Sequence, residues 1–93
     1  DVVFSDAALM YIDKHNIYNV LKEALRISKI KVVICEQHTN DVSFRNNKWV
    51  HNYVLIFKKI STDFKIKIYD LKDDNRDEDW KKYGKIIEVI KNL

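Results

Sequence analysis

Short runs of consecutive apolar residues alternate along the chain with segments in which apolar residues recur every three or four positions. The first run covers residues 2–4 and the second covers residues 32–35, and both consist of β-branched, aromatic and cysteine side chains. Continuous runs of this kind are typical of strands buried on both faces, as in parallel sheets. The two runs therefore predict two inner strands, each followed directly by polar residues.

A helical period separates the two runs. Between residues 13 and 28 the apolar positions form one stripe, made of Ile17, Val20, Leu21, Ala24 and Leu25. This stripe predicts an amphipathic helix of about four turns, and Asp13 is a candidate for its N-cap. We expect Leu21 and Leu25 to face the sheet and to be nearly fully buried.

The second half of the chain predicts one more helix and two more strands. Residues 39–48 are polar and are interpreted as a loop, and a second helical stripe follows: Trp49, Tyr53, Ile56, Phe57 and Ile60. Residues 64–69 alternate apolar and polar side chains, which is the period of a half-exposed strand. An acidic connection at residues 70–79 leads to a last predicted strand at residues 86–90.

The predicted order is strand, helix, strand, helix, strand, strand, which favours an α/β fold with a parallel sheet. The last two strands have no helix between them and should pair antiparallel. Right-handed crossovers place both helices on one face of the sheet. The other face of the inner strands then has no cover within this chain, so we expect covering helices from a missing portion or from another subunit.

Composition excludes several classes of site. Gly84 is the single glycine and there is no proline, which leaves no glycine-rich loop to hold a phosphate. Cys35 is the single cysteine, which excludes an internal disulfide and a zinc site built on several cysteines.

No apolar run approaches the ~20 residues that span a bilayer. With no visible signal peptide, we expect a cytoplasmic protein. Because residue 1 is Asp and not Met, we suspect that the chain starts partway through a larger domain.

Two charged segments suggest weaker hypotheses. The net charge is +3 at pH 7, and the densest basic cluster consists of Lys58, Lys59, Lys65 and Lys67. Since Lys is interleaved with Asp along the chain, we interpret the excess as mostly solvated surface. The acidic segment Asp73, Asn75, Asp77 resembles the start of a calcium loop. We reject calcium binding because Glu78 stands where that loop needs glycine and Gly84 where it needs glutamate.

Four segments in order carry a resemblance to a known family: DVVFSDAALMYI at residues 1–12, LKEALRIS at 21–28, VVICE at 32–36 and WKKYGKIIEV at 80–89. The chain resembles the C-terminal half of a class I S-adenosylmethionine-dependent methyltransferase. WVHNY at residues 49–53 is similar to an aromatic-rich helix start found in some subfamilies. The resemblance implies a partial three-layer Rossmann-like sheet of about four strands and two helices. Residues 1–93 would then be the C-terminal portion of one methyltransferase domain.

Candidate site residues follow the two inner strands, because ligands of open α/β sheets bind outside the carboxyl ends of the strands. By resemblance, Ser5, Asp6 and Ala7 would line the methionine end of S-adenosylmethionine. Glu36 follows four apolar residues, and burial would raise its pKa toward that of a general base. His38 titrates in the range needed for proton transfer. The alternatives are that Glu36 caps a neighbouring backbone or pairs with a lysine, and that His38 is only solvated.

Three further residues are candidates for contacting the methyl acceptor. Tyr11 would cover the site or else close the core, and Trp49 at the predicted helix start would wall a substrate pocket or else anchor the packing. His51 lies off the helical stripe, so we interpret it as a surface residue that could touch substrate. Tyr53 belongs to the stripe and is expected in the core. Cys35 lies mid-strand and is interpreted as a small apolar residue.

The leading hypothesis is a methyltransferase portion that uses S-adenosylmethionine and a small-molecule acceptor in the full-length protein. The family's glycine-rich turn and ribose-binding acid are absent from these residues. We therefore expect the chain alone not to bind the cofactor tightly and to self-associate through its uncovered face. The alternatives are a non-catalytic methyltransferase-like α/β module that acts through a partner, and a small basic nucleic-acid-binding domain that uses residues 58–67.

Overall fold

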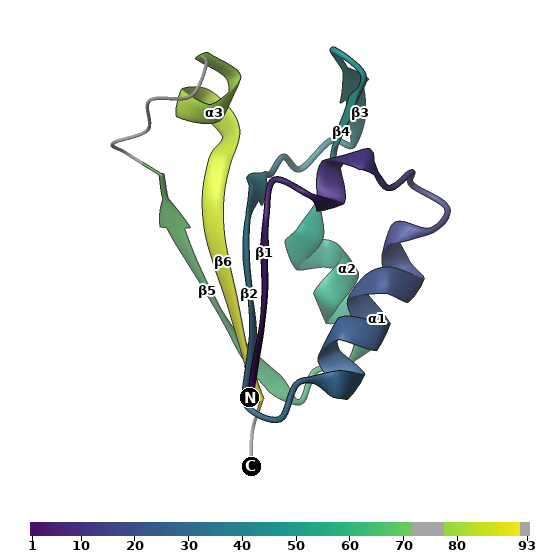
Figure 1. Ribbon diagram of the computed structural model, residues 1–93, viewed down its shortest axis with the longest axis vertical. Coiled ribbons are helices and arrows are strands. Elements are labelled where there is room, and N and C mark those ends of the chain that lie inside the picture. Colours follow the sequence, from purple (N-terminus) through teal and green to yellow (C-terminus); the bar gives the residue numbers. More distant parts are fainter. Residues whose placement is uncertain (72–77, 92–93) are drawn as a thin grey trace.

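The computed structural model describes residues 1–71 and 78–91 of the chain (Figure 1). Elements follow one another in an order close to the predicted one. They are β1 (Val2–Asp6), the 3-10 helix η1 (Leu9–Tyr11), α1 (Ile17–Ile27), β2 (Lys31–Gln37), β3 (Ser43–Arg45), β4 (Lys48–Val50), α2 (Tyr53–Ile60), β5 (Phe64–Asp70), α3 (Glu78–Tyr83) and β6 (Gly84–Lys91). The candidate calcium segment with Asp73, Asn75 and Asp77 lies outside the described residues.

Four strands form one mixed sheet in the order β1-β2-β6-β5 (Figure 1). β1 and β2 are parallel, and β6 is antiparallel to both of its neighbours. The antiparallel pairing of β5 with β6 confirms the prediction for the last two strands. Because β6 inserts between β2 and β5, the strand that comes last in the sequence lies inside the sheet.

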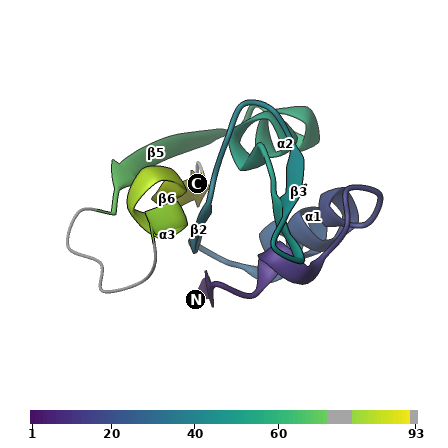
Figure 2. The same ribbon diagram turned by 90° about the horizontal axis from the view of Figure 1, so that it is seen from above.

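Helices α1 and α2 cover the same face of the sheet, as the right-handed crossovers predict (Figure 2). The predicted phase of the first helix is confirmed, since Leu21 is 1% exposed and Leu25 is 5% exposed. The main core lies between these helices and the sheet. Its members from α2, β2 and β6 are Val32, Ile34, Tyr53, Phe57, Ile87 and Val89. These side chains exclude water from one face of β2 and β6.

The first helix begins later than residue 13. The Asp13 carboxylate accepts hydrogen bonds from the backbone N–H groups of His15 and Asn16, both at 3.0 Å. This local turn satisfies the donors that a helix start would otherwise leave unpaired. α1 therefore begins at Ile17, and Asp13 stabilises the turn before it.

The sequence predicts that the opposite face of the sheet, which we call the open face, has no cover within the chain. The structure shows that part of it is covered. Phe4 is 66% exposed and Val2 is 50% exposed, so the first apolar run is not buried on both sides within the described residues. Cys35 is buried on this face because Trp80 of α3 and Met10 of η1 pack against it. The short helix α3, which the sequence pattern did not predict, therefore covers part of the open face near the carboxyl end of β2.

The segment interpreted as a loop contains a β-hairpin. β3 pairs antiparallel with β4, and Phe44 lies opposite Trp49. Asn46 and Asn47 form the turn with φ angles of 51° and 62°, as a two-residue hairpin turn requires. Trp49 consequently lies in a strand and not at the start of a helix. α2 begins four residues later, at Tyr53, where the Asn52 side chain caps the helix by accepting from Leu55 N.

Candidate functional site

The carboxyl ends of β1 and β2 are joined by the side chain of Glu36. Its Oε2 accepts hydrogen bonds from Ala8 N at 3.0 Å, Leu9 N at 3.3 Å and the Ser5 hydroxyl at 3.3 Å. Hydrogen bonds to an ionised acceptor are stronger than neutral ones, so this carboxylate fixes the segment that follows β1. Of the alternatives weighed for Glu36, the structure shows the capping of a neighbouring backbone.

The backbone around Ala7 turns sharply at this point. Ala7 has a φ of 55°, in the left-handed region that a residue with a Cβ rarely adopts. Its N–H donates to the carbonyl oxygen of Cys35 at 3.0 Å, which continues the β1/β2 ladder by one residue. The predicted cofactor-binding residues Ser5, Asp6 and Ala7 therefore lie beside the end of β2, with Asp6 exposed and the other two half-buried.

Glu36 is fully buried, and its environment acts on its pKa in two directions. Burial raises the pKa, while the hydrogen bonds from Leu9, Ala8 and Ser5 lower it, and burial is the larger effect. Its second oxygen, Oε1, has no hydrogen-bond partner among the described residues. The carboxylate is thus half satisfied, with one oxygen holding the segment after β1.

His38 follows β2 and is half-buried. Its Nδ1 accepts a hydrogen bond from Tyr53 N at 3.2 Å, so a neutral ring carries its proton on Nε2. Burial and the charge of Lys85 lower the pKa of this imidazole. At neutral pH His38 therefore offers an N–H donor on its free edge, while its acceptor nitrogen is occupied by the first residue of α2.

His51 was interpreted as a surface residue, and this is wrong: the side chain is 0% exposed. Its Nε2 donates to the carbonyl oxygen of Ile12 at 2.7 Å, and its ring is stacked on Trp49 at a centroid distance of 5.9 Å. The imidazole thereby joins the end of the hairpin to the segment after η1. Burial lowers its pKa, the largest effect on this group. The helical pattern could not predict this burial, because His51 precedes the helix.

Tyr53 is a buried neighbour of both histidines. Its ring centroid lies 5.4 Å from that of His51 and 6.3 Å from that of His38. Burial and the charge of Glu36 raise the pKa of the phenol, so it stays protonated. Three buried polar atoms lack a hydrogen-bond partner among the described residues: Glu36 Oε1, His51 Nδ1 and Tyr53 OH. We call these three side chains the buried polar cluster.

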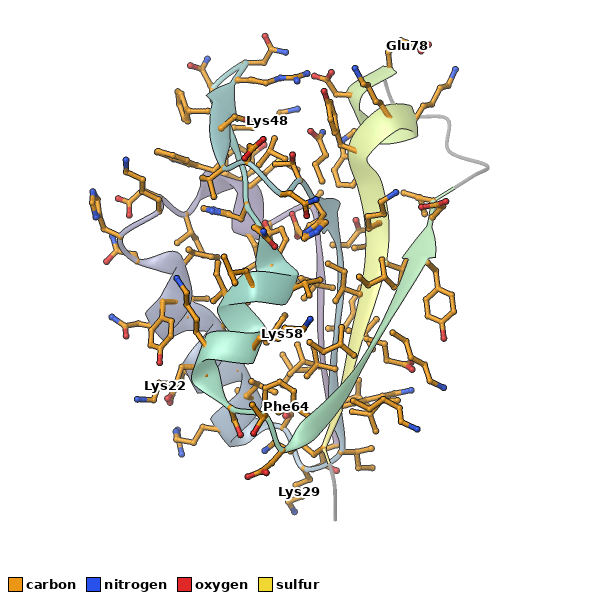
Figure 3. All side chains as sticks on the ribbon, turned by 180° about the vertical axis from the view of Figure 1, so that it is seen from behind. Lys22, Lys29, Lys48, Lys58, Phe64 and Glu78 are labelled. Carbon is orange, nitrogen blue, oxygen red and sulfur yellow. The ribbon has the colours of Figure 1, made fainter. Side chains whose placement is uncertain are left out.

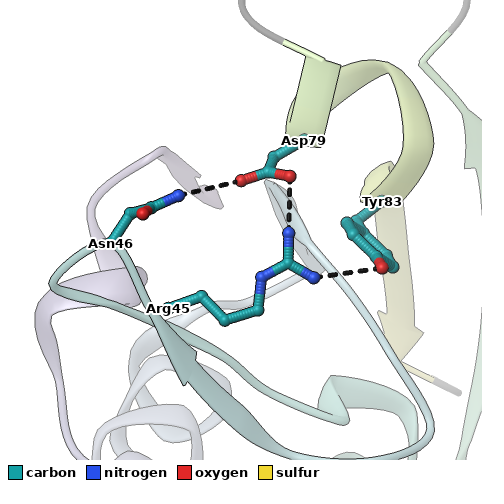
Figure 4. Close-up of polar contacts among 4 residues, drawn as sticks. All are labelled: Arg45, Asn46, Asp79 and Tyr83. Carbon is teal, nitrogen blue, oxygen red and sulfur yellow. Dashed lines mark hydrogen bonds and ion pairs between the residues drawn. The ribbon is translucent and has the colours of Figure 1, made fainter.

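An ion pair connects the hairpin tip to α3 beyond the carboxyl end of β2 (Figure 4). The Arg45 guanidinium donates to Asp79 Oδ1 at 2.5 Å and to Tyr83 OH at 3.1 Å, and Asn46 Nδ2 donates to Asp79 Oδ2 at 3.4 Å. Arg45 and Lys82 lower the pKa of the Tyr83 phenol. Sequence reasoning missed this contact, although two adjacent asparagines between alternating residues are a hairpin signal.

The predicted acceptor-binding residues differ in their exposure to solvent. Tyr11 is 69% exposed, so it does not close the core, while Trp49 is half-buried against His51. His51 and His38 are brought together by an isolated parallel bridge between their backbones. The structure thus gathers His38 and His51 near Tyr53, stacks Trp49 on His51, and leaves Tyr11 in solvent.

The basic cluster is divided between two surfaces. Lys65 and Lys67 alternate along β5 with Phe64 and Ile66, and these two apolar residues pack on the core. Strand alternation therefore turns Lys65 and Lys67 toward the open face, whereas Lys58 lies on α2 at the other face. Among the described residues, no group of three or more histidine, cysteine or acidic side chains has the geometry to hold a metal ion.

Comparison of the chain with protein-family models, with curated proteins and with solved structures found no match. A search of the described helices for one long and apolar enough to cross a membrane found none.

Proposed function

We propose that the chain is the C-terminal portion of an S-adenosylmethionine-dependent methyltransferase domain that acts on a small-molecule acceptor. The observation that carries this proposal is the connection that Glu36 makes between the carboxyl ends of the parallel strands β1 and β2. Ligands of open α/β sheets bind at such ends. The resemblance stated above assigns the cofactor-binding segment and the acceptor-binding residues to the same place.

The residues beside this connection suit the methionine end of the cofactor. Ala7 has a small side chain, and the exposed carboxylate of Asp6 attracts an ammonium group. Glu36 acts as a positioning residue, because its Oε2 holds the backbone that carries both of them. His38 supplies an N–H donor for a polar group of the acceptor. S-adenosylmethionine, when bound, supplies an activated methyl group, and these residues orient it.

The described residues do not provide a turn for the adenosine and ribose. A Cβ added to Gly84 would meet Trp80 O at 2.4 Å, so this glycine serves the junction between α3 and β6. A ligand has no comparable close approach elsewhere in the described chain, because every other residue carries a Cβ. We therefore expect calorimetric titration of the 93-residue chain alone to show no micromolar binding of S-adenosylmethionine.

The proposal is tested on the complete protein whose reading frame contains these residues. Asp6→Asn should weaken S-adenosylmethionine binding about tenfold, equivalent to ~1.4 kcal/mol. Asp63→Asn is the matched control, since Asp63 is an exposed acid just before β5, at the other end of the sheet. A complete protein that does not bind the cofactor, or that binds it equally well with Asp6→Asn, would overturn the proposal.

Glu36→Gln separates positioning from stability. The amide keeps one oxygen for Ala8 N and Leu9 N but loses the charge that strengthens these bonds. We expect methyl transfer by the complete protein to fall more than the free energy of unfolding does, with a larger change in kcat than in the acceptor's KM. Unchanged turnover would remove Glu36 from the site.

A second candidate is favoured by the exposed apolar residues on the open face. Phe4 and Val2 suit a non-catalytic α/β module that acts by binding a partner protein. For this second function we expect the complete protein to bind a partner through the open face and to show no affinity for S-adenosylmethionine. The nucleic-acid alternative receives no such support, because its four lysines do not share one surface.

A further inference from the structure

A groove lies between α2 and the edge strand β5, on the face of the sheet opposite the open face. Its larger part has a volume of about 420 Å³ and its smaller part about 270 Å³. Both parts are lined by Val54, Lys58 and Ile68, so they adjoin and form one continuous depression. Together they fall in the size range of small-molecule sites, which is roughly 300–1,000 Å³.

The floor of the larger part is apolar. Phe64, Ile66 and Ile68 point toward α2 from alternate positions of β5, and Val54 faces them from the helix. Ile68 remains 46% exposed, although it lines the groove together with Val54 of α2. The groove therefore offers hydrocarbon surface to a ligand without any rearrangement of the core.

The polar residues of the groove carry donors and a positive charge. Lys58 lines both parts, and Figure 3 shows it on α2 near Phe64 at the start of β5. His38 lines the smaller part, and its Nδ1 is occupied by Tyr53 N, so its Nε2–H is the group left to bind a ligand. No carboxylate is among the described residues that line either part.

We propose that this groove binds a small amphipathic anion, namely an aliphatic carboxylate of medium length. The carboxylate lies near Lys58 and the Nε2–H of His38, and the hydrocarbon chain lies over Ile66, Ile68 and Phe64. Charge selects the anion, because Lys58 lines both parts of the groove, whereas the acid Asp63 lines only an adjoining depression beyond Ser61 and Phe64. The groove shares His38 with the proposed acceptor site, but none of Ser5, Asp6, Ala7 and Glu36 lines it. Binding is therefore measured without methyl transfer, on the 93-residue chain alone.

The test uses the 93-residue chain and three probes with the same ten-carbon tail: decanoate, decanol and decyltrimethylammonium. Titrations followed by calorimetry and by two-dimensional NMR give the affinity and the site. We expect decanoate to bind at least tenfold more tightly than decanol, with shifted resonances in α2 and β5, and decyltrimethylammonium to bind more weakly than both. Equal affinities, tighter binding of the cation, or shifts confined to the open face would overturn the proposal.

Two lysine variants provide a matched control. Lys58→Gln and Lys67→Gln each remove one positive charge from an exposed position, but only Lys58 lines the groove. Lys58→Gln should weaken decanoate binding about tenfold and leave decanol binding unchanged, whereas Lys67→Gln should change neither. Ile68→Glu, at an exposed position of the floor, should abolish binding of decanoate. Equal effects of the two lysine variants, or no binding of decanoate at millimolar concentration, would show that the groove is not an anion site.

Discussion

The two faces of the sheet present the same kinds of strand residue to different surroundings. Val32, Ile34 and Glu36 of β2 lie toward the helices and are 1%, 1% and 0% exposed. On the open face, Val33 of the same strand is only half-buried, and its neighbour Phe4 on β1 is 66% exposed. A continuous apolar run therefore shows that both sides of a strand suit burial, but the helices decide which side is buried within the described chain.

The open face is itself divided. Across one row of the sheet, Phe4 lies beside Val33, Val33 beside Glu88, and Glu88 beside Lys67. Glu88 also pairs with Lys31 at 3.0 Å in a partly exposed ion pair. In this row the apolar residues lie on β1 and β2 and the charges on β6 and β5. A partner that covers this face gains most where the two parallel strands lie.

The largest expected difference between the faces concerns aliphatic side chains. Leu21→Ala removes a side chain that is 1% exposed from the helix-covered core, and it should lower the free energy of unfolding by about 2–5 kcal/mol. Val2→Ala on the open face should change it by less than ~0.5 kcal/mol. Urea unfolding of both variants checks this, and similar losses would mean that both faces are covered in solution.

Two carboxylates sharpen the comparison. Glu36→Ala removes the acceptor of two backbone N–H groups and one hydroxyl, and it should cost about 1–3 kcal/mol of stability. Glu88→Ala breaks only the partly exposed pair with Lys31, and it should cost no more than ~1 kcal/mol. Denaturant midpoints of the two variants give the order. A larger loss for Glu88→Ala would contradict the assigned role of Glu36.

Acid should reveal the buried histidine. Burial lowers the pKa of His51 from its ordinary value of 6.5, so the unfolded chain binds a proton more readily than the folded one. Its contribution to stability is therefore present above pH 6.5 and lost as the pH falls through the folded-state pKa, with a slope of at most ~1.4 kcal/mol per pH unit. Unfolding measured between pH 7 and pH 5 should be less pH-dependent in His51→Gln.

His15→Gln serves as the control for this measurement, because His15 is exposed before α1. Its pH dependence should match that of the unmodified chain. If both variants flatten the profile equally, the loss of stability in acid does not come from the buried imidazole.

The smallest effect on stability is expected at Phe4. Phe4→Ser replaces a ring that is 66% exposed, so the free energy of unfolding should change by less than ~0.5 kcal/mol. Self-association should nevertheless decrease, because Phe4 is more exposed than Val2, its apolar neighbour on the same strand and face. Sedimentation at several concentrations measures this. A monomeric unmodified chain would instead show that the open face does not drive association.

The sequence predicted those elements whose periodicity extends over several residues. The helical stripe gave the phase of α1 correctly, since Leu21 and Leu25 both lie in the core. The hairpin escaped because β3 and β4 have three residues each, which is too short for a period to be recognised. Its consequence was the wrong assignment of Trp49 to a helix.

The candidate site was predicted by place more than by environment. In the sequence, Ser5 follows the first apolar run and Glu36 follows the second. Parallel pairing of the two strands brings these side chains into contact. The burial of His51 could not be predicted, because it depends on a hairpin that folds back over Ile12. The cover that Trp80 gives to Cys35 likewise joins residues far apart in the chain. Tertiary contacts of this kind leave no local pattern.

The position of β6 has a consequence for the order of folding during translation. Among the described strands, β5 pairs only with β6. The pairing of Lys31 with Ile90 joins β2 to β6, the last strand described. Contacts between residues so far apart form slowly, because a long loop must close first. β1, α1 and β2 leave the ribosome before β6 and are able to pack locally, whereas β5 has no described partner strand until residues 84–91 emerge.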